Sequence, residues 1–376
     1  MQYLVVFLLF ALLGGANIYL AHHTWRWVHH LLPKFPFWVS LVFFLIMTLM
    51  MALSMLKPFR GHFQQVICAV GAIWMGIFVY LLLGYLVADV AVLLPRILRL
   101  VSQQQLVTLR FAAGITAAAL ALSICVYGVF HAQKLTHKEY DVTLSQSPTQ
   151  QLHVVLISDV HLGAIGSEAR LKRIVAQINR LEPDLVCIAG DFFDTDFRSI
   201  QDPEKAIALM KTIRARYGVY ACLGNHDAGK TIGDMLQFME QANVTVLNDA
   251  YTLIGDRLIL AGRLDGFPIG GAGSLERAEL SQVLQDAPAL PLVVLDHNPS
   301  GVDSYDRSDT LVLSGHTHKG QIFPGSLITG AMYTVDYGYH RTQAGVQAIV
   351  TSGAGIWGLP MRVGTNCEIV SIQLKY

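Results

Sequence analysis

The chain has 376 residues and a formal net charge of zero, with 53% hydrophobic but only 14% charged residues. Soluble globular proteins carry about 25% charged residues, so this chain is unusually poor in charge. Its composition as a whole excludes a disordered chain, a collagen-like fibre and a disulfide scaffold. The global basic excess that is typical of nucleic-acid-binding proteins is absent as well.

The charges are distributed unevenly along the chain. Residues 1–132 contain seven basic residues and a single acidic one, Asp89, whereas residues 133–376 contain 20 basic and 26 acidic residues. This split predicts a multi-span transmembrane domain over residues 1–132. A polar linker is predicted over 133–150 and a soluble domain over 151–376.

Four apolar stretches are long enough to cross a bilayer, which requires about 20 apolar residues. They are Tyr3–Ala21, Pro36–Leu56, Val66–Leu94 and Phe111–His131. They predict a multi-pass protein of the cell membrane, with both chain ends on the same side. The first span has no Lys or Arg before it and two after it, which gives a slight preference for an extracytoplasmic soluble domain.

Two polar features of the membrane domain have alternative interpretations. The run His22–His30 contains four histidines and two tryptophans, which suit either a metal or lipid-phosphate site or an interfacial belt. Asp89 either marks a functional site within the membrane or caps a helix end. The five cysteines have no close spacing, so they are expected to be core residues without a disulfide framework.

Strands and helices alternate in the first half of the soluble domain, and strands dominate its end. The pattern predicts helices at 167–181, 204–217 and 231–242, and strands at 152–157, 185–189, 219–223, 244–247, 257–264, 292–295, 310–313, 348–351 and 368–374. This order indicates an α/β layered domain.

Polar side chains follow five of these strands at the point where each strand ends. The segments are Ser158–His161, Gly190–Asp194, Gly224–Asp227, Asp296–Pro299 and Ser314–His318. Ligands of open α/β sheets bind at the carboxyl ends of the strands. The two polar residues of each Asp-x-His or His-x-His pair are expected on one side of an extended backbone, because the strand period is two. Five such segments in this order predict a metal centre.

With these segments, Gln151–Tyr376 resembles the calcineurin-like metallophosphoesterase superfamily. The runs Gly315–Gln321 and Ser352–Arg362 resemble a bacterial branch of membrane-associated phosphoesterases described as UDP-2,3-diacylglucosamine pyrophosphatase-like. The resemblance implies an α/β four-layer metallophosphoesterase sandwich (α-β-β-α). In this chain it would be preceded by an α-helical transmembrane domain of about four spans.

The resemblance also implies two divalent metal ions that share one carboxylate. The first ion would be held by Asp159, His161, Asp191 and His318. The second would be held by Asp191, Asn225, His297 and His316. Carboxylates and neutral imidazoles suit Mn, Fe or Zn. Two such cations neutralise a phosphoester and activate a water as hydroxide for in-line displacement.

Several further residues have predicted roles near this centre. His226 is expected to act as general acid or phosphate clamp, or else as a brace, and Asp227 is expected to orient it. Asp194 and Asp265 either brace the ligands or occupy surface turns. Arg263 either contacts the substrate phosphate or is structural.

Two features follow the last metal motif. Lys319 stands where the bacterial branch often has glycine, and it lies either near the phosphate or in solvent. The segment Ile322–Tyr339 is rich in aromatic and apolar residues. It forms either a lip that faces the substrate or the membrane, or a covered loop with ordinary packing.

The sequence therefore predicts a membrane-anchored dinuclear-metal phosphoesterase. It would hydrolyse a phosphodiester, pyrophosphate or phosphomonoester bond of a lipid-linked or cell-envelope substrate, surrounded by membrane lipids. The alternatives are a tethered phosphoesterase for a soluble substrate and a non-catalytic metal-binding module for a membrane partner. No nucleic-acid partner is expected, because the soluble part is net acidic and has no P-loop. The oligomeric state stays open.

Overall fold

The computed structural model describes residues 2–56, 61–163, 165–271 and 276–376, with the backbone alone at residues 2, 3, 5, 6 and 9. The chain divides into two compact units. The helical unit consists of Met1–Phe130 with Gly358–Met361, and the sandwich unit consists of His131–Trp357 with Arg362–Tyr376.

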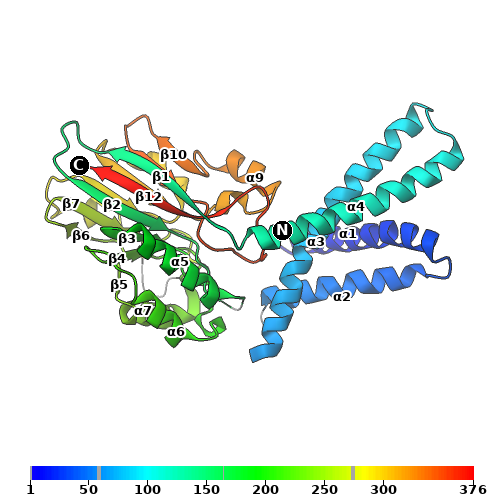
Figure 1. The fold of residues 1–376 in the computed structure, drawn as a ribbon, viewed down its shortest axis with the longest axis horizontal. Helices are drawn as coiled ribbons and strands as arrows, with labels where there is room; N and C mark the ends of the chain where they lie inside the picture. The colour runs from blue at the N-terminus through cyan, green and yellow to red at the C-terminus, as the bar shows by residue number, and fades with distance from the viewer. Residues whose placement is uncertain (1, 57–60, 164, 272–275) are drawn as a thin grey trace. The chain divides into compact units, whose positions relative to one another are not determined.

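The helical unit contains four long helices (Figure 1), which are α1 (Gln2–Leu31), α2 (Phe37–Leu56), α3 (Gly61–Ile97) and α4 (Gln103–His131). Among the described residues, α2, α3 and α4 are long and apolar enough to cross a membrane. They contain three of the predicted spans. The remaining predicted span, Tyr3–Ala21, lies in α1, where several side chains are outside the described residues.

Asp89 belongs to a polar cluster between helices rather than to a helix end. The Tyr19 hydroxyl donates to the Asp89 carboxylate at 2.8 Å, and His23 Nε2 lies 3.2 Å from the same oxygen. The ring of His23 also stacks on Tyr85, with 5.1 Å between the centroids. None of the histidines of His22–His30 belongs to a cluster of metal-ligand type among the described residues, and the interfacial interpretation of that run stays a prediction.

Two six-stranded mixed sheets form the sandwich unit, which confirms the predicted α/β sandwich. The first sheet has the order β1 (Leu135–Thr143), β12 (Cys367–Lys375), β2 (Gln151–Ile157), β3 (Leu185–Ala189), β4 (Val219–Cys222) and β5 (Val244–Val246). The second has the order β10 (Gly338–Arg341), β11 (Gln347–Val350), β9 (Thr310–Ser314), β8 (Leu292–Leu295), β7 (Leu258–Gly262) and β6 (Ala250–Ile254).

Each sheet contains a block of four parallel strands. In the first sheet the block is β2, β3, β4 and β5, and in the second it is β7, β8, β9 and β11. Parallel strands of one sheet end at the same edge, so the loops after β2, β3 and β4 emerge together. The loops after β8 and β9 emerge together for the same reason.

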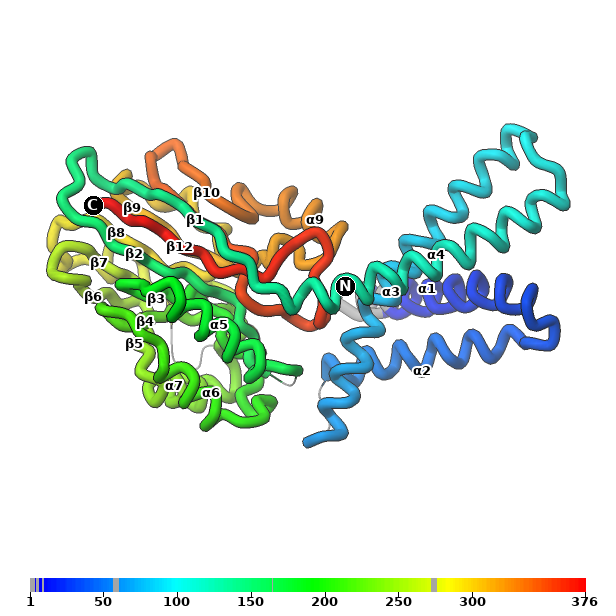
Figure 2. The backbone as a smooth tube through the Cα atoms, in the orientation of Figure 1, coloured from blue at the N-terminus to red at the C-terminus, as the bar shows by residue number. Residues whose placement is uncertain are grey.

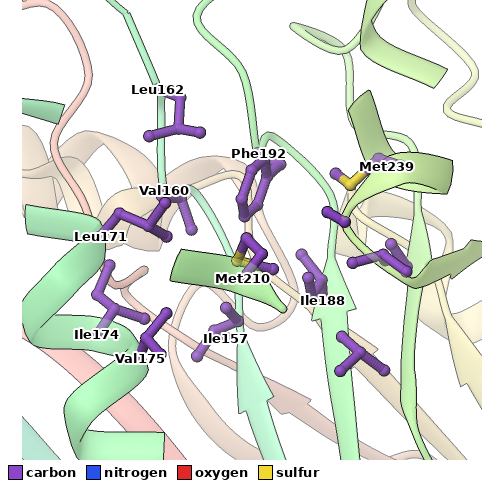
Figure 3. Packing of buried hydrophobic residues seen from close by; sticks show 14 of the residues in the cluster. Ile157, Val160, Leu162, Leu171, Ile174, Val175, Ile188, Phe192, Met210 and Met239 are labelled. Atoms are coloured by element: carbon purple, nitrogen blue, oxygen red, sulfur yellow. The ribbon is translucent and has the colours of Figure 1, made fainter. Parts of the chain in front are cut away.

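Three helices cover the outer face of the first sheet. They are α5 (Ser167–Leu181), α6 (Pro203–Met210) and α7 (Ile232–Gln241). Leu171 and Ile174 of α5 pack in one cluster with Ile157 of β2 and Ile188 of β3, as Figure 3 shows. The spacing of these helix residues is the apolar periodicity that predicts the helix, and α5 and β3 have the predicted bounds.

The outer face of the second sheet has a thinner cover than the predicted helical layer. Short elements pack there, among them α8 (Leu280–Val283) and the 3₁₀ helix η3 (Pro299–Ser304). A third cluster of buried residues lies between the two sheets and includes Leu156, Leu260 and Leu313. This inter-sheet core fixes the two sheets against each other and so fixes the loops at their edges.

The segment predicted as a polar linker, 133–150, contains strand β1, which runs parallel to β12 over Leu135–Thr143 (Figure 2). The prediction of a linker is therefore wrong for these residues. Lys138, Glu139 and Asp141 are exposed on this edge strand, whereas Val142 points into the inter-sheet core and is 1% exposed. Exposed charged residues along this edge strand give the segment its linker-like composition.

Replacement of Val142 by alanine should destabilise the sandwich unit by roughly 1.5–3 kcal/mol, because it removes two buried methyl groups and leaves a cavity. The measurement is the urea midpoint of the full-length chain in detergent, followed by circular dichroism. The control is Asp141→Ala on the opposite, exposed side of the same strand, which should leave the midpoint unchanged. Equal midpoints for both variants would show that β1 is not part of the folded core.

Candidate metal centre

Five loops meet where the parallel strands of both sheets end. The predicted ligands lie directly after these strands, with Asp159 and His161 after β2, Asp191 after β3, Asn225 after β4, His297 after β8, and His316 and His318 after β9. Side chains from the two sheets come into contact here, since His297 Nε2 lies 3.2 Å from Asp191 Oδ2. The structure therefore brings all seven predicted ligands into one buried region.

The backbone of this region is left-handed rather than extended. The φ angles are +52° at Asp159, +48° at His161, +51° at Asp191, +71° at His316 and +50° at His318. The extended backbone expected for the two spaced pairs is therefore wrong. Positive φ costs a residue other than glycine about 1–3 kcal/mol and is typical of functional sites. Here it turns both members of each pair toward the centre.

Gly190 shows how tightly the loops approach each other. Its φ is +77°, and a Cβ atom on it would lie 2.7 Å from the His297 ring and 2.8 Å from the Gly224 Cα atom. Real Cβ atoms essentially never approach that closely, so the position requires glycine for its space as well as for its conformation. This contact joins the loop after β3 to the loops after β4 and β8.

The first set of ligands consists of Asp159, His161 and His318. The two Nε2 atoms of His161 and His318 lie 3.1 Å apart, and His318 Nε2 lies 3.3 Å from Asp159 Oδ1. Two imidazole nitrogens that bind one ion at about 2.1 Å are roughly 3.0–3.4 Å apart. Ser158 Oγ donates to Asp159 Oδ2 at 2.6 Å, so Oδ1 stays directed at the two histidines.

The second set consists of Asn225, His297 and His316. Asn225 Oδ1 lies 2.9 Å from His316 Nδ1 and 3.2 Å from His297 Nε2, and these two nitrogens are 3.3 Å apart. The other ring nitrogen of His297, Nδ1, is 2.8 Å from the carbonyl oxygen of Ala189. A proton on Nδ1 that is donated to this carbonyl leaves the Nε2 lone pair available to a metal ion.

Asp191 lies between the two sets. Its Oδ2 atom is 3.2 Å from His297 Nε2 in the second set and 3.8 Å from His161 Nε2 in the first. Its Oδ1 atom accepts a hydrogen bond from the backbone N–H of His226 at 2.8 Å. The side chain is thus held with one oxygen facing both sets, and the donor atoms are of the kind that divalent Mn, Fe and Zn bind.

Burial sets the protonation of the ligands in the metal-free chain. It lowers the pKa of His161 to about 3 and the pKa of His316 to about 4, so both rings are neutral near pH 7. Burial also raises the pKa of the Asp159 carboxyl to about 6. Burial alone would lower the pKa of His297, but the adjacent Asp191 carboxylate outweighs it and holds that pKa well above its usual value.

His226 is oriented by Thr195, a residue that the sequence did not single out. His226 Nδ1 lies 2.6 Å from Thr195 Oγ1, which leaves Nε2 free of this contact. The His226 ring packs edge-to-face on His161, with 5.1 Å between the centroids. Asp194 completes a cluster with these two histidines, as a brace would.

Asp227 organises the backbone instead of the His226 ring. Its carboxylate accepts hydrogen bonds from the backbone N–H groups of Gly224 at 2.9 Å, Phe192 at 3.2 Å and Phe193 at 2.8 Å. These bonds tie the loop after β4 to the loop after β3. The contact with His226 that was predicted for Asp227 is made by Thr195.

Arg362 is a second residue whose role the sequence did not reveal. The side chain is fully buried, and its Nη1 atom donates to the carbonyl oxygen of His318 at 2.9 Å. Its Nη2 atom lies 3.2 Å from His318 Nδ1 and donates to the carbonyl oxygens of Ser352 and Gly355 at 2.7 Å. Arg362 therefore fixes the backbone and the ring of one candidate metal ligand, His318.

Three other residues with predicted roles have structural contacts. Arg263 is buried and pairs with Asp249 at 2.7 Å, which favours its structural alternative. Lys319 Nζ lies 4.0 Å from the centre of the Tyr337 ring, so it is held by a cation–π contact. Asp265 Oδ1 accepts from a backbone N–H at 2.7 Å, while its Oδ2 is buried without a hydrogen-bond partner among the described residues.

Metal binding should release protons, because a proton on His297 must leave before its Nε2 atom can bind an ion. Since the pKa of His297 is raised in the metal-free chain, metal affinity is expected to rise with pH and to fall as His297 becomes fully protonated. Calorimetric titration of the full-length chain with Mn²⁺ in two buffers of different ionisation enthalpy measures the released protons. His297→Ala should release fewer protons and His340→Ala, a histidine outside the centre, should match the wild type. Equal release from all three proteins would contradict the assignment.

Replacement of Arg362 by methionine should weaken binding at the first metal position by about 10–100-fold, the usual effect of losing a group that orients a ligand. Affinity is measured by competition with a chelator, and near-ultraviolet circular dichroism checks that the variant is folded. Arg341→Met, at an exposed arginine, is the matched control. A folded Arg362→Met protein with wild-type metal affinity would show that His318 does not depend on this contact.

Comparison with known proteins agrees with this geometry. Residues 152–320 match the family model described as calcineurin-like phosphoesterase. The chain is 30% identical to a zebrafish (Danio rerio) protein named transmembrane protein with metallophosphoesterase domain, over 70% of this chain and 63% of that protein. It is 31% identical to the Bacillus subtilis metallophosphoesterase YkuE, over 59% of this chain and 78% of that protein.

A Helicobacter pylori metallophosphoesterase is 30% identical over 60% of each chain. The chain thus spans about 60% of the length of several of these relatives. The matched region contains the loops after β2, β3, β4, β8 and β9, which together carry all seven candidate ligands. The chain therefore belongs to the calcineurin-like metallophosphoesterase family.

Proposed function

We propose that the chain is a membrane-anchored phosphoesterase that holds two divalent ions, of Mn, Fe or Zn. It hydrolyses a phosphodiester, pyrophosphate or phosphomonoester bond of a lipid-linked or cell-envelope substrate. The observation that carries the proposal is the position of Asp191 Oδ2, 3.2 Å from one ligand set and 3.8 Å from the other. A carboxylate oxygen placed in this way suits a bridge between two cations.

Two groups of residues have different roles around the phosphate: one would hold the metal ions, and the other orients the ligands. The first ion would be held by Asp159, His161, Asp191 and His318, and the second by Asp191, Asn225, His297 and His316. When bound, such ions neutralise the phosphate and lower the pKa of the attacking water. Ser158, Ala189 and Arg362 hold three of the ligands in orientation.

His226 is the group best placed to act on the leaving oxygen. Thr195 engages Nδ1 of the ring, so Nε2 can carry the proton that the leaving oxygen receives, or can bind a phosphate oxygen. His226 is buried, with 8% of its surface exposed. Burial keeps bulk water away from this proton and so favours its transfer to the substrate.

The helical unit supports attachment to a membrane. Among the described residues it has three helices long and apolar enough to cross a bilayer, and the similar zebrafish protein is named a transmembrane protein. One span would suffice as an anchor, so several spans favour a substrate that is itself held in the membrane. The first span has two basic residues after it and none before it, which gives a slight preference for a sandwich unit outside the cytoplasm.

Two alternatives make different predictions about turnover. A non-catalytic metal-binding module would bind metal without hydrolysing any phosphoester, but the oriented His226 ring favours an enzyme. A tethered phosphoesterase for a soluble substrate would hydrolyse a water-soluble ester as efficiently as a lipid ester with the same reacting group. The proposed enzyme would hydrolyse the lipid ester more efficiently. Comparison of soluble and lipid esters under the same conditions separates these alternatives.

Replacement of Asp191 by asparagine removes the bridging charge while keeping the side-chain shape. Metal ions supply several kcal/mol of transition-state stabilisation, so activity should fall by roughly 100-fold or more. The measurements are hydrolysis of bis(p-nitrophenyl) phosphate by the Mn²⁺-loaded, full-length chain and the metal content of the purified protein. Wild-type protein should hold two ions per chain, and Asp191→Asn should hold fewer.

The matched control is Asp286→Asn, because Asp286 is an exposed acid in a loop. It should keep both the metal content and the activity of the wild type. A folded Asp191→Asn protein with wild-type turnover would refute the proposed function. Metal bound by the wild type without hydrolysis of diester or monoester would favour the non-catalytic module instead.

A further inference from the structure

Helix α9 (Gly325–Met332) exposes its large apolar side chains on the described part of the sandwich unit. None of its residues is buried, and Leu327, Ile328 and Met332 are 65%, 60% and 70% exposed. Phe323, just before the helix, is 51% exposed. The described part of the chain after residue 131 has nine exposed large apolar side chains, and four of them fall in this short segment. The structure therefore contradicts the covered-loop alternative for residues 323–332, whereas Val335 of the same segment is buried in a core cluster.

The segment is attached directly to the metal motif. Thr317, between the ligands His316 and His318, donates to the carbonyl oxygen of Asp336 at 2.6 Å. The carboxylate of Asp336 in turn accepts from Thr329 of α9 at 2.8 Å. Through Asp336, the helix and the histidine motif are linked by two consecutive hydrogen bonds.

Both ends of α9 contact the same motif. The backbone of Gly325, the first residue of α9, packs so closely on Gly320 that a Cβ atom at Gly320 would overlap it. At the other end, the ring of Tyr333 lies 6.1 Å from the ring of His316, measured between centroids. The apolar surface of α9 is therefore held next to the place where a phosphate would bind.

The composition of this surface favours lipid over protein as its partner. Residues 320–335 contain no charged side chain, as is required of a surface that enters the apolar part of a bilayer, where a charge is costly. The four exposed side chains, Phe323, Leu327, Ile328 and Met332, include no Trp, Tyr or Arg, the residues in which the hot spots of protein–protein interfaces are enriched. Large exposed apolar patches mark interaction sites, and the same chain carries helices apolar enough to enter a bilayer.

We propose that α9 contacts the acyl chains of a membrane lipid at the bilayer surface and presents the phosphate of that lipid to the metal centre. This inference rests on the proposed function and names its substrate class, a phosphoester with an acyl chain close to the phosphate. Leu327 and Ile328 bind the apolar part, while the links through Asp336 and Gly325 fix the distance to His316 and His318.

The first experiment measures lipid contact without using activity. The five native cysteines are buried, so a cysteine added by Ile328→Cys can be labelled selectively with an NBD fluorophore in the full-length chain. The protein is placed in nanodiscs of phosphatidylcholine and phosphatidylglycerol that contain doxyl-labelled lipid as quencher. Quenching is expected at position 328 but not for Leu253→Cys, a control on strand β6 that is 37% exposed.

Quenching that is equal at both positions, or absent at position 328, would overturn the proposal. Fluorescence at position 328 that depends on protein concentration and ignores the doxyl lipid would also overturn it, in favour of contact with a second copy of the chain. These outcomes do not depend on whether the protein hydrolyses any ester. Failure of lipid contact is thereby separated from failure of the proposed function.

The second experiment compares methyl and hexadecyl esters of p-nitrophenyl phosphate with the Mn²⁺-loaded chain. Hydrolysis adds water across the bond between phosphorus and the nitrophenyl oxygen and gives p-nitrophenol and the alkyl phosphate. The double variant Leu327→Ser and Ile328→Ser should raise the KM for the hexadecyl ester roughly tenfold and leave kinetics on the methyl ester unchanged. Leu253→Ser should change neither.

An equal loss on both esters would show that α9 acts by positioning His316, and an unchanged KM for the hexadecyl ester would show that the helix does not bind the chain. Either result overturns the proposal. If the wild type hydrolyses neither ester, the phosphodiesterase form of the proposed function fails, and the fluorescence experiment alone then decides whether α9 contacts lipid.

Discussion

Asp191 and Asp159 are buried carboxylates that no arginine or lysine neutralises among the ion pairs of the described residues. Their neighbours in these ion pairs are histidines alone, and burial keeps one of them, His161, neutral near pH 7. Two other acids of the same unit are paired with arginine instead, since Asp296 contacts Arg277 and Asp249 contacts Arg263, each at 2.7 Å. A buried negative charge is costly. His297, whose pKa is raised by Asp191, compensates part of this charge in the metal-free chain, and bound cations would compensate the rest. The strand ends and the inter-sheet core of the sandwich unit hold the carboxylates of Asp159 and Asp191 close together.

The architecture brings these groups together through the ends of parallel strands. Strands β2, β3 and β4 of one sheet and β8 and β9 of the other end at the centre, and the inter-sheet core keeps their loops in register. The loops then depart from regular geometry. Five ligands have positive φ angles, and Gly190 leaves room for only a hydrogen beside His297. Strain of this kind persists where the surrounding structure over-determines it, and here two packed sheets do so.

The sequence predicts the parts of this arrangement that depend on local pattern. Apolar periodicity predicts α5 and β3 with the observed bounds, and polar residues after buried strands predict which side chains meet. It does not predict β1, because charged residues on the exposed side of an edge strand resemble a linker. Nor does it predict Thr195 and Arg362, whose contacts depend on the fold. Arg362 reaches His318 across 44 positions of the chain, and no local pattern marks that distance.

The segment after the last metal motif has to satisfy two requirements at once. Its polar groups are used internally, where Thr317 and Thr329 both bond to Asp336, while its apolar side chains stay outside. A helix that only supported the histidines would gain stability by turning Leu327 and Ile328 into the core, since burial of each is worth about 1.5–3 kcal/mol. The fold forgoes that gain next to the metal centre. Large exposed apolar patches mark interaction sites. Under the proposal, α9 selects a substrate with an acyl chain and holds its phosphate at a fixed distance from His316 and His318.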